Sequence, residues 1–342
     1  MGRYADIKDN YANLNKALDF FHASYGNGLF ILDILTNHET RFYLDYIQKY
    51  VKKQLDGTIC TYLNQSDEIK QHFEKNKRVE FGMKTPIWVC WFQGYEKMPE
   101  LVKECYKNLH RMVDLDVGEI VLITENNFEN YVKIDPSILK KIRDGKMSYT
   151  NLSDLLRVNL LAIYGGMWID ATVYVTSRIS KQLLSKPFYS QKTTTEFYVK
   201  RYVTKSRWAS WMMIASSKEE LFKFVAFIMN DYYLKHDTLI DYYFIDYVIE
   251  IAYNRLESAH ASIDSVEINN TRAFEMFNMF NEEYNPERFK RIVDTTQFLK
   301  FTYKSDLFEE TESGKLTNYG FFRKRYIEGT YEDGTVDLHN SN

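Results

Sequence analysis

The stretch YGGMWIDATV, residues 164–173, contains the pattern that most narrows the fold. Two glycines precede an apolar run that predicts a strand from Trp168 to Val173. Side chains of a strand alternate between its faces, so Trp168, Asp170 and Thr172 are expected to point to one side. An unpaired carboxylate is costly to bury in such a strand. Asp170 is therefore the first candidate for a functional residue.

The residues before and including the two glycines, NLSDLLRVNLLAIYGG (151–166), predict an amphipathic helix. Its leucines recur at helical spacing, and Gly165 or Gly166 is expected to supply the left-handed cap at its end. Asp154 and Arg157 are three positions apart and so share one face of the helix. Taken alone, the two could equally form a structural ion pair, and the sequence leaves that alternative open.

Two further apolar runs predict neighbouring strands of a parallel sheet. PIWVCWFQG (86–94) and EIVLIT (119–124) are each typical of a strand that is buried on both faces. The residues between them, MPELVKECYKNLHRMV, predict a helix, so the three segments form a right-handed βαβ unit. Ligands bind at the carboxyl ends of such strands, where Trp91 and Asp170 are expected.

The remaining segments favour helices. Ser217 and Glu220 fit a capping box that would open a helix over the apolar run after them. We expect three regions in the chain of 342 residues. They are an N-terminal helical accessory region (1–80), a core (81–260) and a C-terminal helical region (261–342) that completes the same domain.

The net charge, the cysteines and the absence of known motifs argue against several functional classes. The net charge of −3 argues against a broad nucleic-acid-binding surface. The chain has no dinucleotide fingerprint, P-loop, zinc motif or serine-hydrolase elbow. Its three cysteines form no CxxC pair, which favours a reducing compartment. The first residues lack the apolar core of a secretory signal, and no apolar run approaches the roughly 20 residues of a spanning helix. We therefore expect a cytoplasmic protein.

The polar residues near the expected strand ends could bind a diphosphate and a metal. A hard cation such as Mn²⁺ or Mg²⁺ takes oxygen ligands, which Asp170 and Thr172 could provide. Arg157 could pair with Asp154 or with a sugar or phosphate oxygen. Trp91 could stack on a base, although a tryptophan considered alone is more often a core residue.

The order of PIWVCWFQG and NLSDLLRVNLLAIYGGMWIDAT resembles that of glycosyltransferases with a DXD sugar-binding region. Within that family-32-like group, the chain is most similar to bacterial capsular polysaccharide synthesis proteins. The resemblance covers residues 84–176 and extends weakly to about Lys304 through IDYYFIDY (240–247) and FLKFTYK (298–304). It implies an α/β fold of the GT-A type, Rossmann-like with a mostly parallel sheet and additional N-terminal and C-terminal helices. It also implies a nucleotide-sugar donor, expected to be UDP-linked, and a divalent metal. In these terms residues 81–260 would be the nucleotide-sugar-binding catalytic core and 261–342 the acceptor-side region.

The resemblance assigns roles to individual positions. Trp91 would stack on the donor base, Asp154 and Arg157 would hold the donor sugar, and Asp170 matches the first aspartate of the D-x-D motif. Thr172 replaces the second aspartate, a form that the capsular subgroup shares. The expected donor-binding residues are Trp91, Gln93, Asp154, Arg157, Gly165, Gly166, Asp170 and Thr172. Asp154, Arg157 and Asp170 are expected to be catalytic, Asp170 and Thr172 to bind metal, and Asp241 and Lys300 to lie on the acceptor side.

The resemblance predicts an enzyme of surface polysaccharide synthesis. It would transfer a hexose from a nucleotide-sugar to a saccharide acceptor, lipid-linked, with retention of configuration. Two alternatives stay open: an inactive saccharide-binding or scaffold protein of the same fold, and a glycosyltransferase that modifies proteins. Two basic, aromatic stretches, 192–208 and 321–326, are either solvated surface or a peripheral contact with the anionic inner face of the membrane.

Overall fold

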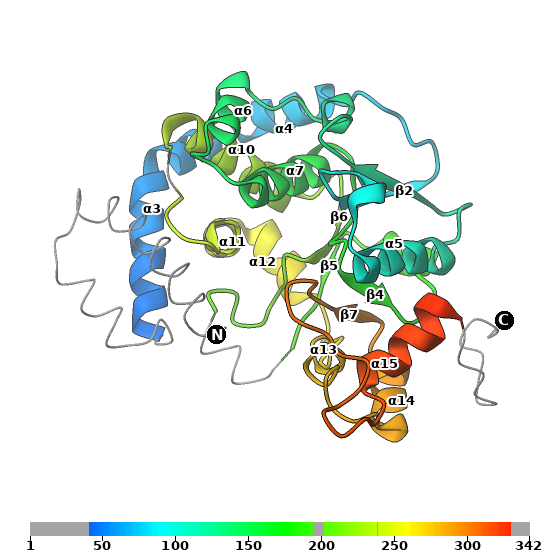
Figure 1. Cartoon of the computed structure of the whole chain (residues 1–342). Coiled ribbons are helices and arrows are strands. Elements are labelled where there is room, and N and C mark those ends of the chain that lie inside the picture. Colours follow the sequence, from blue (N-terminus) through cyan, green and yellow to red (C-terminus); the bar gives the residue numbers. More distant parts are fainter. Residues whose placement is uncertain (1–40, 194–201, 238, 330–342) are drawn as a thin grey trace.

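A central five-stranded sheet forms the middle layer of the molecule (Figure 1). The computed structural model describes residues 41–193, 202–237 and 239–329. The strands are β1 (Thr85–Cys90), β2 (Gly118–Ile123), β3 (Gly165–Ile169), β5 (Phe188–Ser190) and β6 (Met212–Ser216), in the order β2-β1-β3-β6-β5. β1 is parallel to β2 and β3, whereas β6 is antiparallel to β3 and β5. Four strands therefore run in one direction, and the prediction of an α/β fold with a mostly parallel sheet is confirmed.

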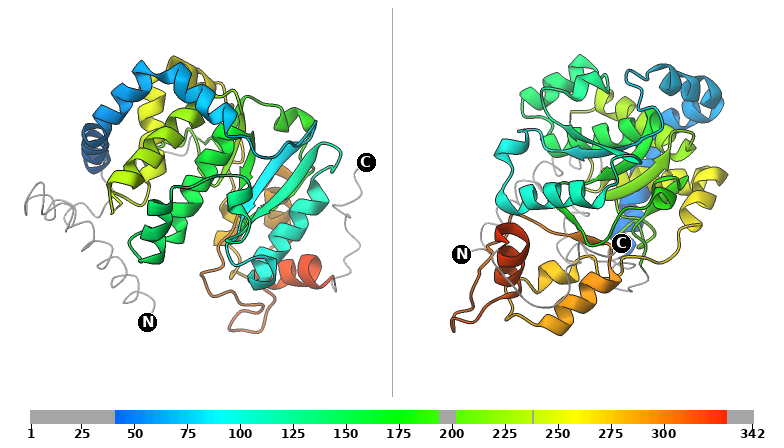
Figure 2. Two further views of the ribbon diagram at one scale, coloured as in Figure 1. Left: turned by 90° about the horizontal axis from the view of Figure 1, so that it is seen from above. Right: turned by 90° about the vertical axis from the view of Figure 1, so that its right-hand side faces the viewer.

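Helices cover both faces of the sheet (Figure 2). Trp88 and Trp168 point to the face that packs against the larger helical layer, whereas Ile87 and Met167 point to the opposite face. The larger layer consists of α3 (Arg41–Asn64), α4 (Ser66–Lys75), α6 (Pro136–Arg143), α7 (Tyr149–Ile163), α10 (Glu220–Lys235), α11 (Phe244–Arg255) and α12 (Glu257–Asp264). The opposite face packs against α5 (Glu100–Met112), which joins β1 to β2 and completes the expected βαβ unit.

A second, two-stranded sheet lies between the central sheet and the C-terminal helices. β4 (Val173–Val175) pairs antiparallel with β7 (Phe298–Lys300). An aromatic cluster that includes Tyr174, Phe301 and Phe322 joins this sheet to the helices beside it. The remaining elements are η1 (Tyr95–Lys97), η2 (Phe128–Asn130), α8 (Lys181–Leu184), α13 (Glu275–Asn278), α14 (Pro286–Thr295), α15 (Asn318–Phe322) and the π-helical η3 (Arg323–Glu328).

The two glycines of YGGMW fix the angle between α7 and β3. Gly165 follows the helix cap at Tyr164 with a φ of +69°, so the predicted left-handed cap is confirmed. Gly166 has a φ of +90°, and a Cβ atom there would lie 2.2 Å from the carbonyl oxygen of Pro86. Glycine is therefore required at this position both by the backbone angle and by the closeness of β1.

Two details of the sequence interpretation were wrong. β3 ends at Ile169 and β4 begins at Val173, so no single strand runs through Asp170. Instead the amide of Val173 donates to the carbonyl oxygen of Asp170 at 3.0 Å, in a turn that leads the chain from one sheet to the other. The capping box is also absent, because α10 begins with Glu219 as its N-cap and without a side-chain capping bond.

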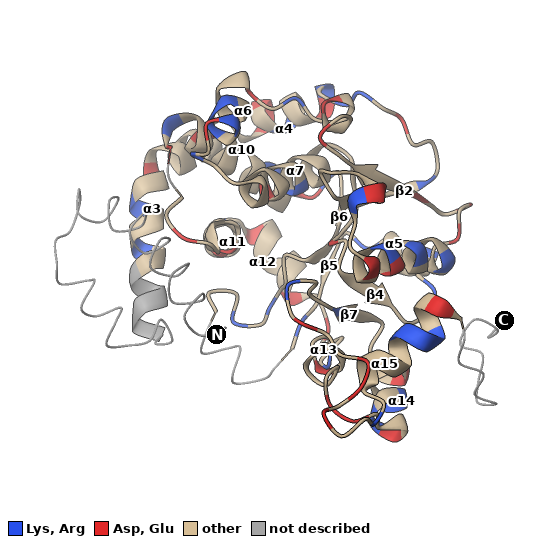
Figure 3. Cartoon of the chain, viewed as in Figure 1, with Lys and Arg blue, Asp and Glu red and all other residues tan. Residues whose placement is uncertain are grey.

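Charged residues lie mostly on the helices and loops around the sheet (Figure 3). Within the five strands of the central sheet, Glu119 of β2 is the one charged residue, and it is exposed. Among the helices that the structure describes, none is long and apolar enough to cross a membrane.

Candidate functional site

α7 places Asp154 and Arg157 at the edge of the sheet where β1 and β3 end. Ser148 and Asn151 form a capping box at the start of this helix. Nη1 of Arg157 donates to Oδ1 of Asp154 at 2.8 Å, and Nη2 donates to Oδ1 of Asp170 at 3.2 Å. The arginine side chain is only 7% exposed, so one buried guanidinium joins two carboxylates from different elements.

Asp170 is tolerated after an apolar strand because three donors meet its carboxylate. Nε1 of Trp168 donates to Oδ1 at 3.0 Å, so Trp168 and Asp170 share a side, as strand alternation predicted. The Arg157 guanidinium lies over the Trp168 ring, 4.8 Å from its centroid, and donates to the same oxygen. The third donor is Lys300, at 2.7 Å from Oδ2. The side chain of Asp170 is still 26% exposed, so a ligand can reach it.

Lys300 comes from the distant strand β7. Its Nζ donates to Oδ2 of Asp170 and to Oγ1 of Thr172, at 2.7 Å in each case. Strand pairing sets Lys300 opposite Val173, which brings the lysine alongside the turn that carries Asp170 and Thr172. The sequence assigned Lys300 to the acceptor side, whereas the structure brings it together with the expected metal ligands.

The acidic groups of the site differ in how readily they ionise. Burial opposes ionisation of Asp170, but Lys300 and Arg157 together outweigh it and hold the pKa of Asp170 below its usual value. Burial raises the pKa of Asp154 to about 6, because the single partner Arg157 offsets burial only in part and the charge of Asp170 adds to the rise. Asp170 therefore stays ionised to lower pH than Asp154, which takes up a proton as the pH falls through about 6.

Trp91 lies just after β1, at the same edge of the sheet. Its ring is partly buried and meets the ring of Tyr303 edge to face, with 5.3 Å between the centroids. Nε1 of Trp91 is buried and has no hydrogen-bond partner within the described residues. Gln93, two positions later, is exposed. Trp91 thus combines a core contact with a polar atom that a ligand could satisfy.

The start of α11 adds two residues that sequence analysis missed. Asp246 is buried and accepts a hydrogen bond from Nε1 of Trp208 at 2.9 Å. Burial raises the pKa of Asp246 to about 7, and the charge of Asp154 contributes to this rise. Tyr242 is 70% exposed, and partial desolvation together with the charges of Asp154 and Asp170 raises its pKa. Both residues lie in IDYYFIDY. The dense aromatic and acidic composition of this segment is the sequence feature that could have indicated their place near the site.

Asp241 lies at the same helix start, where its Oδ1 accepts the backbone amide of Tyr243 at 2.8 Å. Its negative charge contributes to the raised pKa of Asp246 and of Tyr243, which burial causes for the most part. The structure therefore places Asp241 near the predicted site, beside the start of α11. Lys300, the other residue assigned to the acceptor side, instead contacts Asp170 and Thr172 within the part of the chain that the structure describes.

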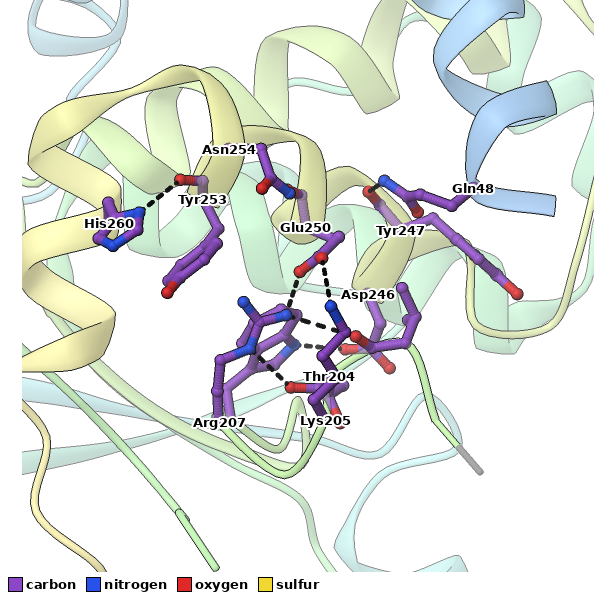
Figure 4. Close-up of polar contacts among 12 residues, drawn as sticks. Gln48, Thr204, Lys205, Arg207, Asp246, Tyr247, Glu250, Tyr253, Asn254 and His260 are labelled. Carbon is purple, nitrogen blue, oxygen red and sulfur yellow. Dashed lines mark hydrogen bonds and ion pairs between the residues drawn. The ribbon is translucent and has the colours of Figure 1, made fainter. Parts of the chain in front are cut away.

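The segment that precedes β6 is anchored to α11 by charge. Glu250 of α11 pairs with Arg207 and Lys205, and Asp246 points towards the same segment (Figure 4). The Arg207 guanidinium lies between the rings of Trp208 and Tyr253, at 4.8 and 4.1 Å from their centroids. These contacts hold Trp208, the partner of Asp246, in position.

The two basic, aromatic stretches are largely engaged within the protein. Residues 194–201 of the first stretch lie outside the described residues, and Trp208 at its end is buried. In the second stretch Phe321 and Phe322 are buried, and Arg323 forms ion pairs with Glu100, Glu309 and Glu328. These positions lend no support to a membrane contact, which stays a prediction.

Gly165 and Gly166 are not brought together with the other expected donor-binding residues. They begin β3, whereas Asp170 follows its last residue. A strand of this length spans about 16 Å at roughly 3.3 Å per residue. Their contacts with Pro86, Ala215 and Ser217 give them a structural role at the opposite end of the strand.

The residues as arranged do not fit the divalent cation that the resemblance implies. Such a cation would bind Asp170 and Thr172 through oxygen at about 2.0–2.6 Å. In the structure the positively charged Nζ of Lys300 lies between those same two groups and would repel it. Within the described part of the chain, no group of three or more His, Cys, Asp or Glu side chains is arranged to hold a metal.

Comparisons with known proteins identify the family. Residues 34–319 match the family described as Capsular polysaccharide synthesis protein. The chain belongs to this family. The family assignment made from the sequence is thereby confirmed.

Two individual proteins show more distant similarity. The O-glycosyltransferase PaGT of Phomopsis amygdali is 28% identical over 144 residues, which cover 40% of this chain and 36% of PaGT. The chain thus matches about a third of the length of that relative. A solved structure titled WbbM bifunctional glycosytransferase (apo structure) aligns with 74% of this chain and 52% of its own chain, at 11% identity and a TM-score of 0.39.

Proposed function

We propose that the protein is a glycosyltransferase that moves a hexose from a nucleotide-sugar, expected to be UDP-linked, to a saccharide acceptor in the synthesis of a surface polysaccharide. Family membership supports the reaction class. The carrying observation is the contact between Asp170 and both Arg157 and Lys300, at 3.2 and 2.7 Å, at the carboxyl end of β3. Two cations held on one reachable carboxylate are suited to receive a diphosphate.

The nucleotide and the sugar would lie on either side of the diphosphate that Arg157 and Lys300 bind. Trp91 would stack on the base at the end of β1. Asp154 would accept hydrogen bonds from sugar hydroxyls, since its side chain is 14% exposed and its partner Arg157 orients it. Tyr242 is 70% exposed and close enough to Asp154 and Asp170 for their charges to raise its pKa, and it would meet the acceptor.

Transfer with retention requires no strong enzymic base in this site. The bond between the anomeric carbon and the β-phosphate oxygen breaks, and its electron pair stays on the phosphate. The acceptor hydroxyl oxygen bonds to the same face of that carbon, and its proton passes to the leaving phosphate. Arg157 and Lys300 would stabilise the charge that develops on the phosphate, which is where preorganised donors contribute most.

The test is a panel of nucleotide-sugars, scored for binding and for donor hydrolysis by the purified full chain. Hydrolysis of one donor supports a transferase. Binding of saccharides without hydrolysis of any donor would favour the inactive scaffold. With a labelled donor, label in a lipid extract would support the lipid-linked acceptor, whereas label in protein would favour a protein-modifying enzyme.

A further inference from the structure

The position of Lys300 is fixed by the backbone on both sides. Its own amide donates to the carbonyl oxygen of Ala273 at 2.7 Å, and the amide of the next residue, Phe301, donates to the carbonyl oxygen of Thr172 at 2.9 Å. The second bond ties β7 directly to the turn that holds Asp170. The lysine is therefore built into the site by strand pairing and does not reach it from a long surface loop.

We propose that the ammonium group of Lys300 takes the place of the divalent cation, so that the protein binds the diphosphate of its donor without a metal. This inference rests on the proposed function and concerns the same site. A lysine has three N–H donors. Two meet Asp170 and Thr172, and the third has no partner within the described residues. The lysine side chain is 20% exposed, so this third donor can meet a phosphate oxygen.

The charges of the site are consistent with this substitution. A divalent ion brings two positive charges to a diphosphate, whereas Lys300 brings one. Arg157 brings the second, because its guanidinium contacts the same carboxylate at 3.2 Å. Asp170 then acts as a positioning residue: it holds both cations and leaves their remaining N–H groups for the ligand. Thr172 fits this role better than an aspartate would, since its hydroxyl accepts from the lysine without neutralising it.

The same arrangement would be seen if Lys300 were a stand-in that swings away when a metal enters. The two cases differ in what a chelator does. If the lysine is the permanent cation, diphosphate binding survives EDTA. If the lysine is displaced, binding requires Mn²⁺ or Mg²⁺, and removal of the lysine does not weaken it.

The experiment is calorimetric titration of the full chain with UDP, followed by GDP, CDP and ADP, in EDTA and again in Mn²⁺. We expect one nucleoside diphosphate to bind the wild-type chain with affinities within about threefold in the two conditions. Lys300→Gln, which keeps a hydrogen-bond donor but removes the charge, should bind it about 10-fold to 100-fold more weakly in EDTA. The matched control is Lys290→Ala on α14, whose side chain is 65% exposed and pairs with Asp294; it should bind like wild type.

The outcomes separate this inference from the proposed function. Binding that disappears in EDTA and returns with Mn²⁺ overturns the inference but leaves a glycosyltransferase. Wild-type affinity in Lys300→Gln overturns it as well. If none of the diphosphates binds in either condition, the proposed function falls together with the inference. The comparison of EDTA with Mn²⁺ needs only the wild-type chain, so it decides the question even if the variant does not fold.

Discussion

Lys300 and Asp170 stand 130 positions apart in the chain, yet Nζ of one lies 2.7 Å from Oδ2 of the other. The contact joins the end of the central sheet to the two-stranded sheet. It also makes Asp170 the point where the charges of α7 and β7 meet.

Asp170→Asn removes the negative charge at nearly constant shape. We expect transfer or donor hydrolysis to fall by about 10²–10³-fold, because Arg157 and Lys300 lose the group that orients them. Initial rates with the donor identified in the panel measure the effect, and the melting midpoint checks the fold. Asp294→Asn, on the surface of α14, is the control. Turnover close to wild type would mean that Asp170 is structural.

Trp91→Ala should weaken nucleotide binding by roughly 1–3 kcal/mol, the usual contribution of stacking on an aromatic ring. Trp91→Phe keeps a ring and should recover part of the loss. Titration with the free nucleoside diphosphate measures binding. If the alanine variant binds normally, or only its melting midpoint falls, Trp91 is a core residue that packs against Tyr303.

Asp154→Ala and Arg157→Ala should reduce affinity for the nucleotide-sugar more than affinity for the free diphosphate. The two side chains contact each other at 2.8 Å, so the double variant should differ from the sum of the single variants by about 0.5–3 kcal/mol. A double-mutant cycle with both ligands measures this coupling. Strict additivity, or equal losses for both ligands, would place the pair away from the sugar.

Asp246→Asn tests the raised pKa of the buried Asp246 carboxyl on α11. Between the ordinary pKa of 3.8 and the raised value of about 7, the folded chain keeps a proton on Asp246 that the unfolded chain has lost. Stability of the wild type should therefore fall as pH rises through this window, by up to about 1.4 kcal/mol per pH unit for this one group. Denaturant unfolding at pH 5, 6, 7 and 8 measures the slope.

The asparagine variant should show a shallower slope and gain stability relative to wild type at pH 8. Asp154 contributes with the same sign up to its pKa of about 6 and is unchanged in this variant. Asp170 has a lowered pKa, so its contribution is lost only at more acidic pH. An unaltered slope would show that Asp246 is ionised in the folded protein.

Gly166→Ala separates a structural role from donor binding. Both the φ of +90° and the Cβ position 2.2 Å from the Pro86 oxygen oppose the substitution, so it should cost at least about 3 kcal/mol. Gly145→Ala is the matched control, because Gly145 has a φ of +72° but open space around it. Loss of ligand binding at normal stability would instead support the donor-binding assignment.

Local patterns in the sequence predicted most elements that form the site. The apolar runs predicted β1 and β2, and the leucine spacing predicted α7. Strand alternation predicted that Trp168 and Asp170 point to the same side of the chain. The break of the strand at Asp170 could not be predicted, since β4, the strand after the turn, pairs with the distant β7 and not within the central sheet. Lys300 was selected for another role because pairing across 130 positions leaves no local signal. The raised pKa of Asp246 comes from burial of its carboxyl in the folded chain, which is equally non-local.

The antiparallel pairing of β4 and β7 has a consequence for changes far from the site. Phe298 and Lys300 lie on one side of β7, whereas Leu299 and Phe301 belong to the aromatic cluster on the other side. A slip of one residue in this pairing would turn Lys300 into that cluster and present an apolar side chain to Asp170. A single-residue insertion or deletion between α14 and β7, at Thr296 or Gln297, would thus remove the contact between Lys300 and Asp170, although every residue of the site stays unchanged. Across the family, the length of this short connection would be as informative as the residues it positions.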